Sequence, residues 1–189
     1  MPSPIGHALA GAAIAASAGR FSKPTASNRA LRATLALTCA VLAALPDLDL
    51  VYAPIHRTVT HSVGATLLVT IIAMGVTGRV MSGISSRTAL WLALICGAAY
   101  GSHVLLDWLA RDPYPPLGIQ ALWPFSDRWF TSGWNIFRPT ERRALFSWAA
   151  IATNVKAVAQ EVAILGPLLW LAMRTRRTRA PISVRDDQP

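Results

Sequence analysis

Residues 89–110, ALWLALICGAAYGSHVLLDWLA, form the longest apolar run of the chain and carry two ionisable side chains within it. The run is long enough to cross a lipid bilayer as one helix, for which about 20 residues suffice. His103 and Asp107 lie four positions apart, so a helix presents both side chains on one face, one turn apart. Because ionisable groups within a membrane are costly, such a pair marks a functional site or a buried structural pair.

The rest of the chain shares this apolar character. Hydrophobic residues fill 53% of its 189 positions and charged residues only 14%, and the mean hydropathy is +0.40, whereas about a quarter of the residues of soluble domains are charged. Further apolar segments lie at 5–19, 31–45, 61–78 and 157–173, with a weaker one at 144–153. The sequence therefore predicts an all-α fold, a small polytopic membrane helix bundle of about four to six helices. We expect residues 1–175 to form one domain and residues 176–189 a basic, disordered cytoplasmic tail.

The net charge of +9 does not indicate a nucleic-acid-binding protein, because the cations are dispersed between the apolar runs and at the C-terminus. If each main segment crosses the membrane once, the cations of connectors 20–30 and 79–88 and of the tail lie on one side. The positive-inside rule makes this side cytoplasmic. The cations of the 111–156 connector, on the other side, weaken this assignment. We expect a multi-pass protein with a cytoplasmic tail.

All four histidines fall on the non-cytoplasmic side in this topology, together with three aspartates. The seven candidate metal ligands are His7, Asp47, Asp49, His56, His61, His103 and Asp107. Pro46 ends the helix before it, so Asp47 and Asp49 lie in a turn or extended stretch where their side chains can converge. Imidazole nitrogen with carboxylate oxygen suits Zn²⁺, Mn²⁺ or Fe, and is too nitrogen-rich for Ca²⁺ or Mg²⁺. We predict a site for one or two divalent ions, with zinc favoured.

Simpler explanations stand beside this one. Asp47 and Asp49 can be turn residues after Pro46, and His103 with Asp107 can be a structural hydrogen bond. If the metal were structural, the protein would be a scaffold or a regulator that binds another protein. A transporter that carries metal ions through the bundle is a third possible function. A catalytic site keeps an open coordination position, whereas a structural site is closed by protein ligands. Seven candidate ligands exceed the need of one closed tetrahedral site, which favours catalysis.

The order of these motifs carries a resemblance. The motifs are Gly6-His7, Leu45-Pro46-Asp47-Leu48-Asp49, His56-Arg57, Thr60-His61-Ser62, His103 with Asp107, and Trp123-Pro124-Phe125-Ser126. Their combination resembles the LexA-binding, inner-membrane-associated hydrolase family, also called YdjM-like membrane-bound metal-dependent hydrolases. The resemblance covers roughly residues 1–135 and the last helix. It implies a multi-helix protein of the bacterial inner membrane with a metal-dependent hydrolase site.

Such a site would activate water, because a bound metal lowers the pKa of its water toward neutrality. Asp49 is the candidate general base and Arg57 the candidate for stabilising an anionic phosphoryl group, although Arg57 suits the membrane surface equally well. The ligand set is similar in kind to that of zinc-dependent phospholipase C enzymes. We therefore expect a lipid or lipid-linked phosphoester as substrate, with other ester or amide bonds left open. Membrane lipids are the expected partners, and the sequence itself shows no protein partner.

Overall fold

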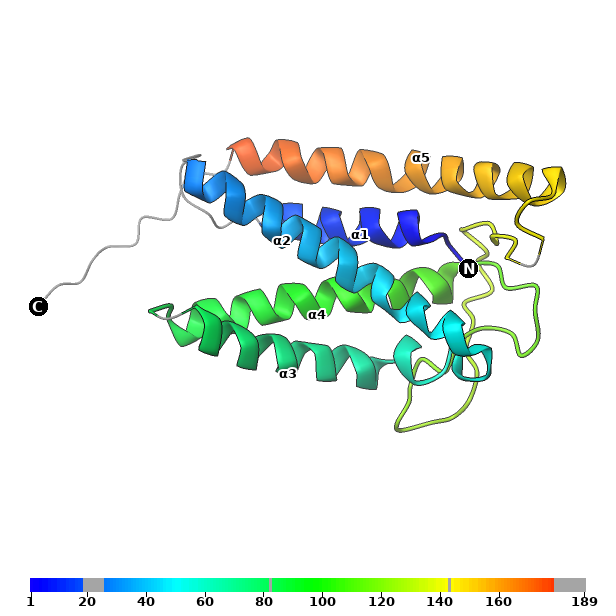
Figure 1. The fold of residues 1–189 in the computed structure, drawn as a ribbon, viewed down its shortest axis with the longest axis horizontal. Coiled ribbons are helices and arrows are strands. Elements are labelled where there is room, and N and C mark those ends of the chain that lie inside the picture. Colours follow the sequence, from blue (N-terminus) through cyan, green and yellow to red (C-terminus); the bar gives the residue numbers. More distant parts are fainter. Residues whose placement is uncertain (19–25, 82, 143, 179–189) are drawn as a thin grey trace, which may run out of the picture.

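The described part of the chain, residues 1–18, 26–81, 83–142 and 144–178 of a computed structural model, folds into α-helices joined by irregular segments. The α-helices are α1 (Pro4–Ser17), α2 (Ala26–Ala44), α3 (Val63–Val80), α4 (Ser86–Leu109) and α5 (Trp148–Thr178). Two 3-10 segments, η1 (Leu45–Ile55) and η2 (Val59–His61), connect α2 to α3. The helices run side by side along the long axis of the molecule (Figure 1). The predicted all-α bundle is confirmed.

Four helical stretches within the described residues are long and apolar enough to cross a membrane. They are Arg29–Tyr52, Val63–Val80, Ser86–Leu109 and Trp148–Thr175. Helix α1 has 14 residues, fewer than the ~20 of a comfortable crossing. The weak segment predicted at 144–153 is not a separate element. Its last residues open α5, because neither glycine nor proline interrupts the chain between Trp148 and Leu165. Residues 179–189, most of the predicted tail, lie outside the described residues.

Helix α4 forms the centre of the bundle and packs against α1, α2 and α3. One core cluster joins α1, α2 and α4 through Ala15, Leu35, Cys39, Leu92, Ile95 and Ala99. Helix α3 has no buried residue, and it approaches α4 where a Cβ added to Gly97 would lie 2.0 Å from Thr70 Oγ1. Helix α3 is thus an apolar helix with a largely exposed surface, which suits contact with lipid.

Small residues bring α1 close to its neighbours. A Cβ added to Gly11 would lie 2.2 Å from the carbonyl oxygen of Cys39 on α2, and one added to Gly6 would lie 2.6 Å from Glu161 Oε2 on α5. Only glycine permits these approaches, as in the packing of membrane helices through small residues.

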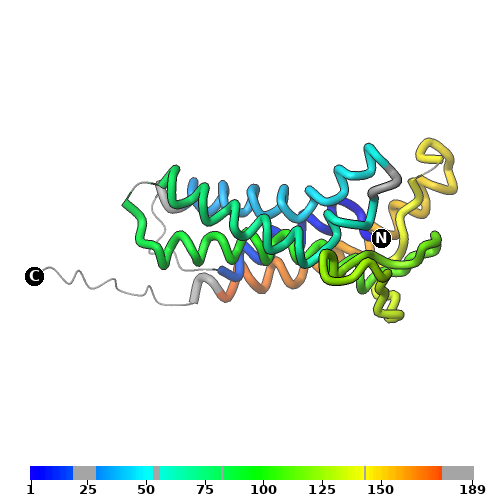
Figure 2. Tube along the Cα trace, turned by 90° about the horizontal axis from the view of Figure 1, so that it is seen from below, coloured from blue at the N-terminus to red at the C-terminus, as the bar shows by residue number. Residues whose placement is uncertain are grey.

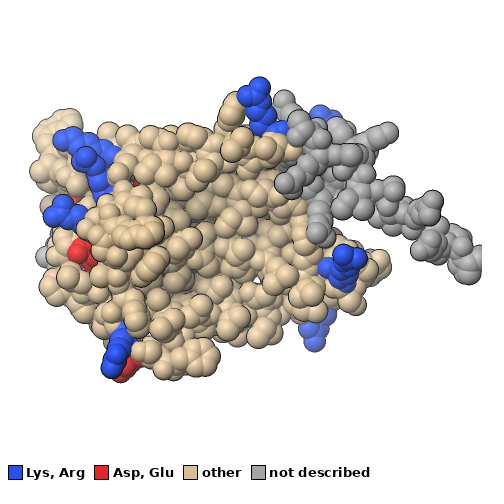
Figure 3. All heavy atoms as spheres, turned by 180° about the vertical axis from the view of Figure 1, so that it is seen from behind, with Lys and Arg blue, Asp and Glu red and all other residues tan. Residues whose placement is uncertain are grey.

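The two ends of the bundle differ. Residues 110–147 gather at the end where the N-terminus lies, as Figure 2 shows in green to yellow. Isolated bridges between Ala110 and Phe137 and between Ile119 and Phe130 hold this segment together. On the face seen in Figure 3, Lys, Arg, Asp and Glu lie toward the two ends, and the band between them is uncharged. An uncharged band between charged ends matches the hydrocarbon layer of a bilayer.

Candidate metal centre

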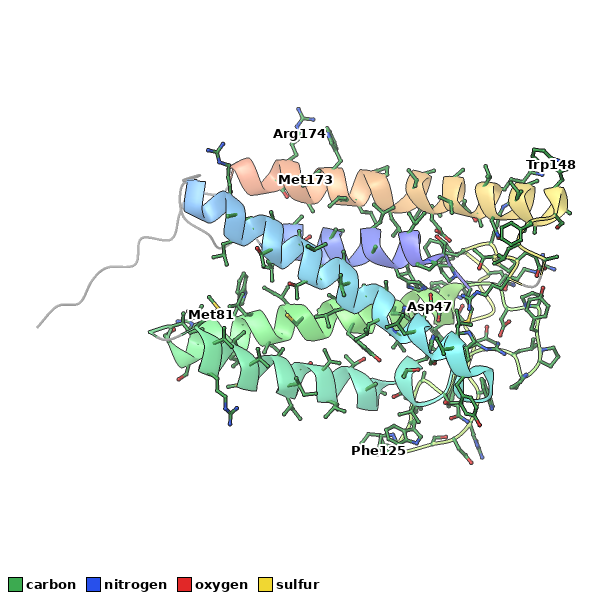
Figure 4. All side chains as sticks on the ribbon, viewed as in Figure 1. Asp47, Met81, Phe125, Trp148, Met173 and Arg174 are labelled. Atoms are coloured by element: carbon green, nitrogen blue, oxygen red, sulfur yellow. The ribbon has the colours of Figure 1, made fainter. Side chains whose placement is uncertain are left out.

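The structure brings four histidines and three aspartates to one end of the bundle. They come from α1 (His7), η1 (Asp47 and Asp49), the turn after η1 (His56), η2 (His61) and α4 (His103 and Asp107). In Figure 4, Asp47 lies where α2 ends, at the same end as Phe125 and Trp148 and away from Met81. Candidates that are a hundred residues apart in sequence are thus neighbours in space.

Asp107 lies at the middle of this cluster. Its Oδ1 is 3.4 Å from His7 Nε2, and its Oδ2 is 3.4 Å from His61 Nε2 and 3.1 Å from His103 Nε2. The rings of His7 and His103 stack with centroids 3.7 Å apart. Two ligands bound at 2.0–2.1 Å to a tetrahedral zinc lie about 3.4 Å apart. The spacing of these atoms therefore fits a shared metal ion.

Asp47 approaches two of the same histidines. Its Oδ1 is 4.0 Å from both His61 Nε2 and His103 Nε2. This separation is wider than the spacing of two ligands on a tetrahedral zinc. Asp47 therefore lies beside the cluster, further from these two nitrogens than Asp107 does.

Hydrogen bonds fix which nitrogen of two imidazoles faces the cluster. His103 Nδ1–H donates to the carbonyl oxygen of Ala43 at 2.7 Å, which leaves a lone pair on Nε2. The hydroxyl of Thr60 donates to Asp49, so it accepts from His61 Nδ1–H at 3.0 Å, and Asp49 Oδ2 lies 3.2 Å from the same nitrogen. Burial lowers the pKa of His61, which favours the neutral imidazole. Both Nε2 atoms are therefore prepared to bind a metal.

Several buried polar atoms of the cluster have no hydrogen-bond partner within the described residues. They are both ring nitrogens of His7, Nε2 of His61 and of His103, and both carboxylate oxygens of Asp47 and of Asp107. Buried polar atoms without partners are rare because each costs free energy. A divalent ion could bind one nitrogen of each imidazole together with oxygens of the two carboxylates, and this donor set of three imidazoles and two carboxylates suits one.

Asp49 and His56, two of the predicted ligands, lie behind this cluster. Arg142 is always protonated, so its Nη1 donates to His56 Nε2 at 3.1 Å. His56 Nδ1 then carries the hydrogen that it donates to Asp49 Oδ1 at 2.6 Å. Asp47, His56 and His61 offer ligand atoms within 4.8 Å of one another, but His56 has a free lone pair only if Arg142 moves away. In this arrangement His56 and Asp49 support His61 instead of facing the centre.

Arg57, the predicted phosphoryl-binding residue, is directed elsewhere. Its Nη1 donates to the carboxylate of Asp112 and to the carbonyl oxygen of Tyr114 at 3.3 Å, and its guanidinium lies 5.6 Å from the ring centroid of Trp129. These contacts hold the 112–129 part of the connector. The charge of Arg57 is thus paired with Asp112 outside the cluster, and its predicted role in binding a phosphoryl group stays a prediction.

Arg142 is the cation that does reach the cluster. Its Nη2 lies 3.6 Å from Asp47 Oδ1, and its Nη1 contacts His56. In the sequence this residue is one of several arginines of the 111–156 connector, and no motif distinguishes it. Sequence reasoning missed it because an irregular segment of this length does not fix where a side chain points.

A buried carboxylate on α5 sets the position of α1. Glu161 has 0% exposure and accepts hydrogen bonds from Ser3, at 2.7 Å from the backbone N–H and also from the hydroxyl. The Ser3 hydroxyl in turn accepts from Gly6 N–H at 3.2 Å and caps α1. A negative charge at a helix N-terminus is stabilising. Glu161 thereby anchors the turn that carries His7.

Comparison with known proteins identifies a family. No curated protein and no solved structure matches the chain. A family model described as "YdjM inner membrane protein" matches residues 1–179, and the family resemblance seen in the motifs is thereby confirmed. Since the match spans nearly all of the 189 residues and the helices are long and apolar enough for a membrane, the chain belongs to the YdjM inner membrane protein family.

Proposed function

We propose that this protein is a membrane-bound metal-dependent hydrolase whose metal is held by His7, His61, His103, Asp47 and Asp107. The observation that carries the proposal is a set of buried ligand atoms that have no hydrogen-bond partner in the part of the chain that the structure describes, gathered from three parts of the chain. Zinc is the favoured ion because imidazole nitrogens predominate. One ion is favoured over two, because His56 and Asp49 already use their polar atoms for hydrogen bonds.

When bound, the metal supplies a water whose pKa is lowered toward neutrality, which makes a nucleophile available. Asp47 is less deeply buried than Asp107, and one of its two oxygens can accept the proton of the attacking water. Asp49 acts by holding the tautomer of His61, since both of its oxygens are engaged. The general-base role first assigned to Asp49 therefore passes to Asp47.

We place the cluster on the non-cytoplasmic side of a multi-pass protein in the bacterial inner membrane. Support comes from the described cations at the helix ends opposite the cluster, which are Arg29, Arg79, Arg87 and Arg174. The positive-inside rule assigns that end to the cytoplasm. The cluster end carries arginines as well, but there Asp112 pairs with Arg57 and Arg142 faces Asp47.

A lipid or lipid-linked ester is the favoured substrate. An apolar groove of about 400 Å³ lies between α3 and α4 beneath residues 121–130, a volume typical of ligand sites. Thr66, its polar lining residue, turns its hydroxyl to the carbonyl oxygen of Ser62. The α4 residues that line it, from Gly101 to Trp108, lie at the level of His103 and Asp107. The groove would hold an acyl chain at the depth of the metal centre.

A non-catalytic scaffold is the second candidate. The three imidazoles have 0% exposure, as in structural sites that protein ligands close. The two functions differ in whether water and substrate reach the metal. The test must therefore measure metal content and hydrolysis in the same preparations.

The experiment compares wild type with His61→Ala and Asp107→Ala, purified in uncharged detergent. Asp127→Ala is the matched control, because Asp127 is an exposed acid at the same end of the bundle. We expect wild type and control to retain metal and to hydrolyse members of a lipid phosphoester panel, and both site variants to lose metal and activity. A wild type that holds no metal and behaves as the variants do would refute the metal site. A wild type that retains metal but hydrolyses no ester of the panel would favour the non-catalytic scaffold.

A further inference from the structure

The guanidinium of Arg142 lies at the accessible edge of the metal cluster. Its side chain is 29% exposed, whereas those of His7, His61 and His103 have no exposed surface. A substrate that reaches the metal from this edge passes Arg142. Resting on the proposed function, we infer that Arg142 binds an anionic oxygen of the substrate beside the metal, so that the substrate class is a phosphate ester.

Arg142 is held in place by the residue before it. The Asn154 side chain on α5 binds both backbone groups of Glu141: its Oδ1 accepts from the N–H at 2.7 Å, and its Nδ2 donates to the carbonyl oxygen at 2.9 Å. The Glu141 carboxylate accepts from the N–H of Arg142 and from the hydroxyl of Tyr114, both at 2.9 Å. The backbone at Arg142 is thus fixed from several sides. A cation fixed in advance stabilises charge without reorganisation at the moment of reaction.

The guanidinium retains an unused donor. Nη1 is engaged with His56, but the buried Nη2 makes no hydrogen bond within the described residues, and Asp47 Oδ1 lies 3.6 Å from it. Arginine presents several N–H groups in a planar fork that matches the oxygens of phosphate. An oxyanion placed between Nη2 and the cluster would satisfy this donor.

The permanent charge of Arg142 selects among ester substrates. A phosphodiester carries a negative charge on its non-bridging oxygens before and during reaction, whereas a carboxylic ester or an amide is neutral in the ground state. In hydrolysis the water oxygen forms a bond to phosphorus and the bond to the alcohol breaks. The alcohol oxygen takes the bonding electron pair and then the proton held by Asp47. Arg142 neutralises the charge on the phosphoryl oxygens throughout, as cationic clamps do in phosphoryl transfer.

Charge balance is the competing explanation for Arg142, and it predicts a different result. If the guanidinium served only to offset the charge of Asp47, then its removal would leave metal binding unchanged or stronger, with no effect on phosphate. If it shaped the site structurally, its removal would weaken metal retention. Binding of a substrate oxyanion predicts that metal is retained and phosphate affinity is lost.

The test uses the full-length protein in uncharged detergent, loaded with zinc, with inorganic phosphate as the ligand in calorimetric titrations. Variants are Arg142→Gln and Arg142→Lys. Arg138→Gln is the control, because it removes an exposed arginine from the same connector. We expect all four proteins to retain zinc, and Arg142→Gln to bind phosphate about 10- to 100-fold more weakly, the range for a lost charge-assisted hydrogen bond. Arg142→Lys should fall between, because an ammonium keeps the charge without the fork.

The outcomes separate the two proposals. A zinc-loaded wild type that binds no phosphate, or an Arg142→Gln variant that binds it as tightly as wild type, overturns the inference and leaves the metal site standing. Loss of zinc from Arg142→Gln shows a structural role and also overturns it. A wild type that cannot hold zinc overturns the proposed function and the inference together.

Discussion

Replacing Asp49 with asparagine tests whether this residue holds His61 or acts on substrate. The carboxylate accepts hydrogen bonds from His56 Nδ1 and from the Thr60 hydroxyl, and its Oδ2 lies 3.2 Å from His61 Nδ1. Asparagine has nearly the same shape but offers one oxygen, and its amide group replaces the other acceptor with a donor. The three contacts therefore cannot all survive in either orientation of the amide.

Each orientation has a definite cost. If the amide NH₂ faces His61, the imidazole switches its tautomer to accept from it, and the hydrogen moves to Nε2, where it blocks the metal. If the NH₂ faces His56, two N–H groups meet, because His56 carries its hydrogen on Nδ1. This imidazole cannot switch its tautomer, since Arg142 already donates to its other nitrogen, and it therefore loses its partner. Loss of the partner that orients a metal-bound histidine costs about 10- to 100-fold in metal affinity, or about 1.4–2.8 kcal/mol.

Zinc affinity is measured by competition with a chromophoric chelator in uncharged detergent, with Asp127→Asn as the control for loss of a carboxylate at the same end. We expect Asp49→Asn to bind zinc 10- to 100-fold more weakly, and to recover activity when zinc is added in excess. An Asp49→Asn protein with wild-type zinc affinity and a much lower kcat would refute this reasoning, because it would return the general-base role to Asp49.

Three further substitutions test the helices that carry the site. Glu161→Ala leaves the buried Ser3 N–H without its partner, at a cost of about 1–3 kcal/mol. It should lower zinc affinity more than Glu161→Gln does in the same chelator assay. The control Lys156→Ala, at an exposed residue of α5, should leave zinc affinity unchanged. Gly11→Ala forces α1 away from α2 and should destabilise the protein by about 1–3 kcal/mol in thermal unfolding, whereas Gly78→Ala, with open space around it, should not. Val104→Trp fills the apolar groove and should lower kcat/KM for long-chain esters while sparing short-chain ones; equal losses for both would count against an acyl-chain site.

The helices and the candidate metal ligands of the cluster could be predicted from the sequence, whereas the roles of the residues around those ligands could not. His103 and Asp107 could be paired because helix periodicity fixes side chains four positions apart. Their partners could be placed at the same membrane face because alternating crossings leave few choices.

The roles of Arg57 and Arg142 could not be separated in this way, because both lie in irregular segments whose paths depend on contacts such as Asn154 with Glu141. The same limit applies to His56. Whether it offers a lone pair to a metal is decided by Arg142, which lies 86 residues further along the chain.

The anchoring of α1 by Glu161 has a consequence for how the protein is made. The proposed metal ligands end at Asp107, but the carboxylate that fixes the turn before His7 is on the last helix, as is the Asn154 that presents Arg142. A chain that enters the membrane from its N-terminus thus carries every ligand before it carries the groups that hold them in position. The cluster is therefore fully positioned only once α5 is in place, and a nascent chain that still lacks α5 presents these side chains without the groups that position them.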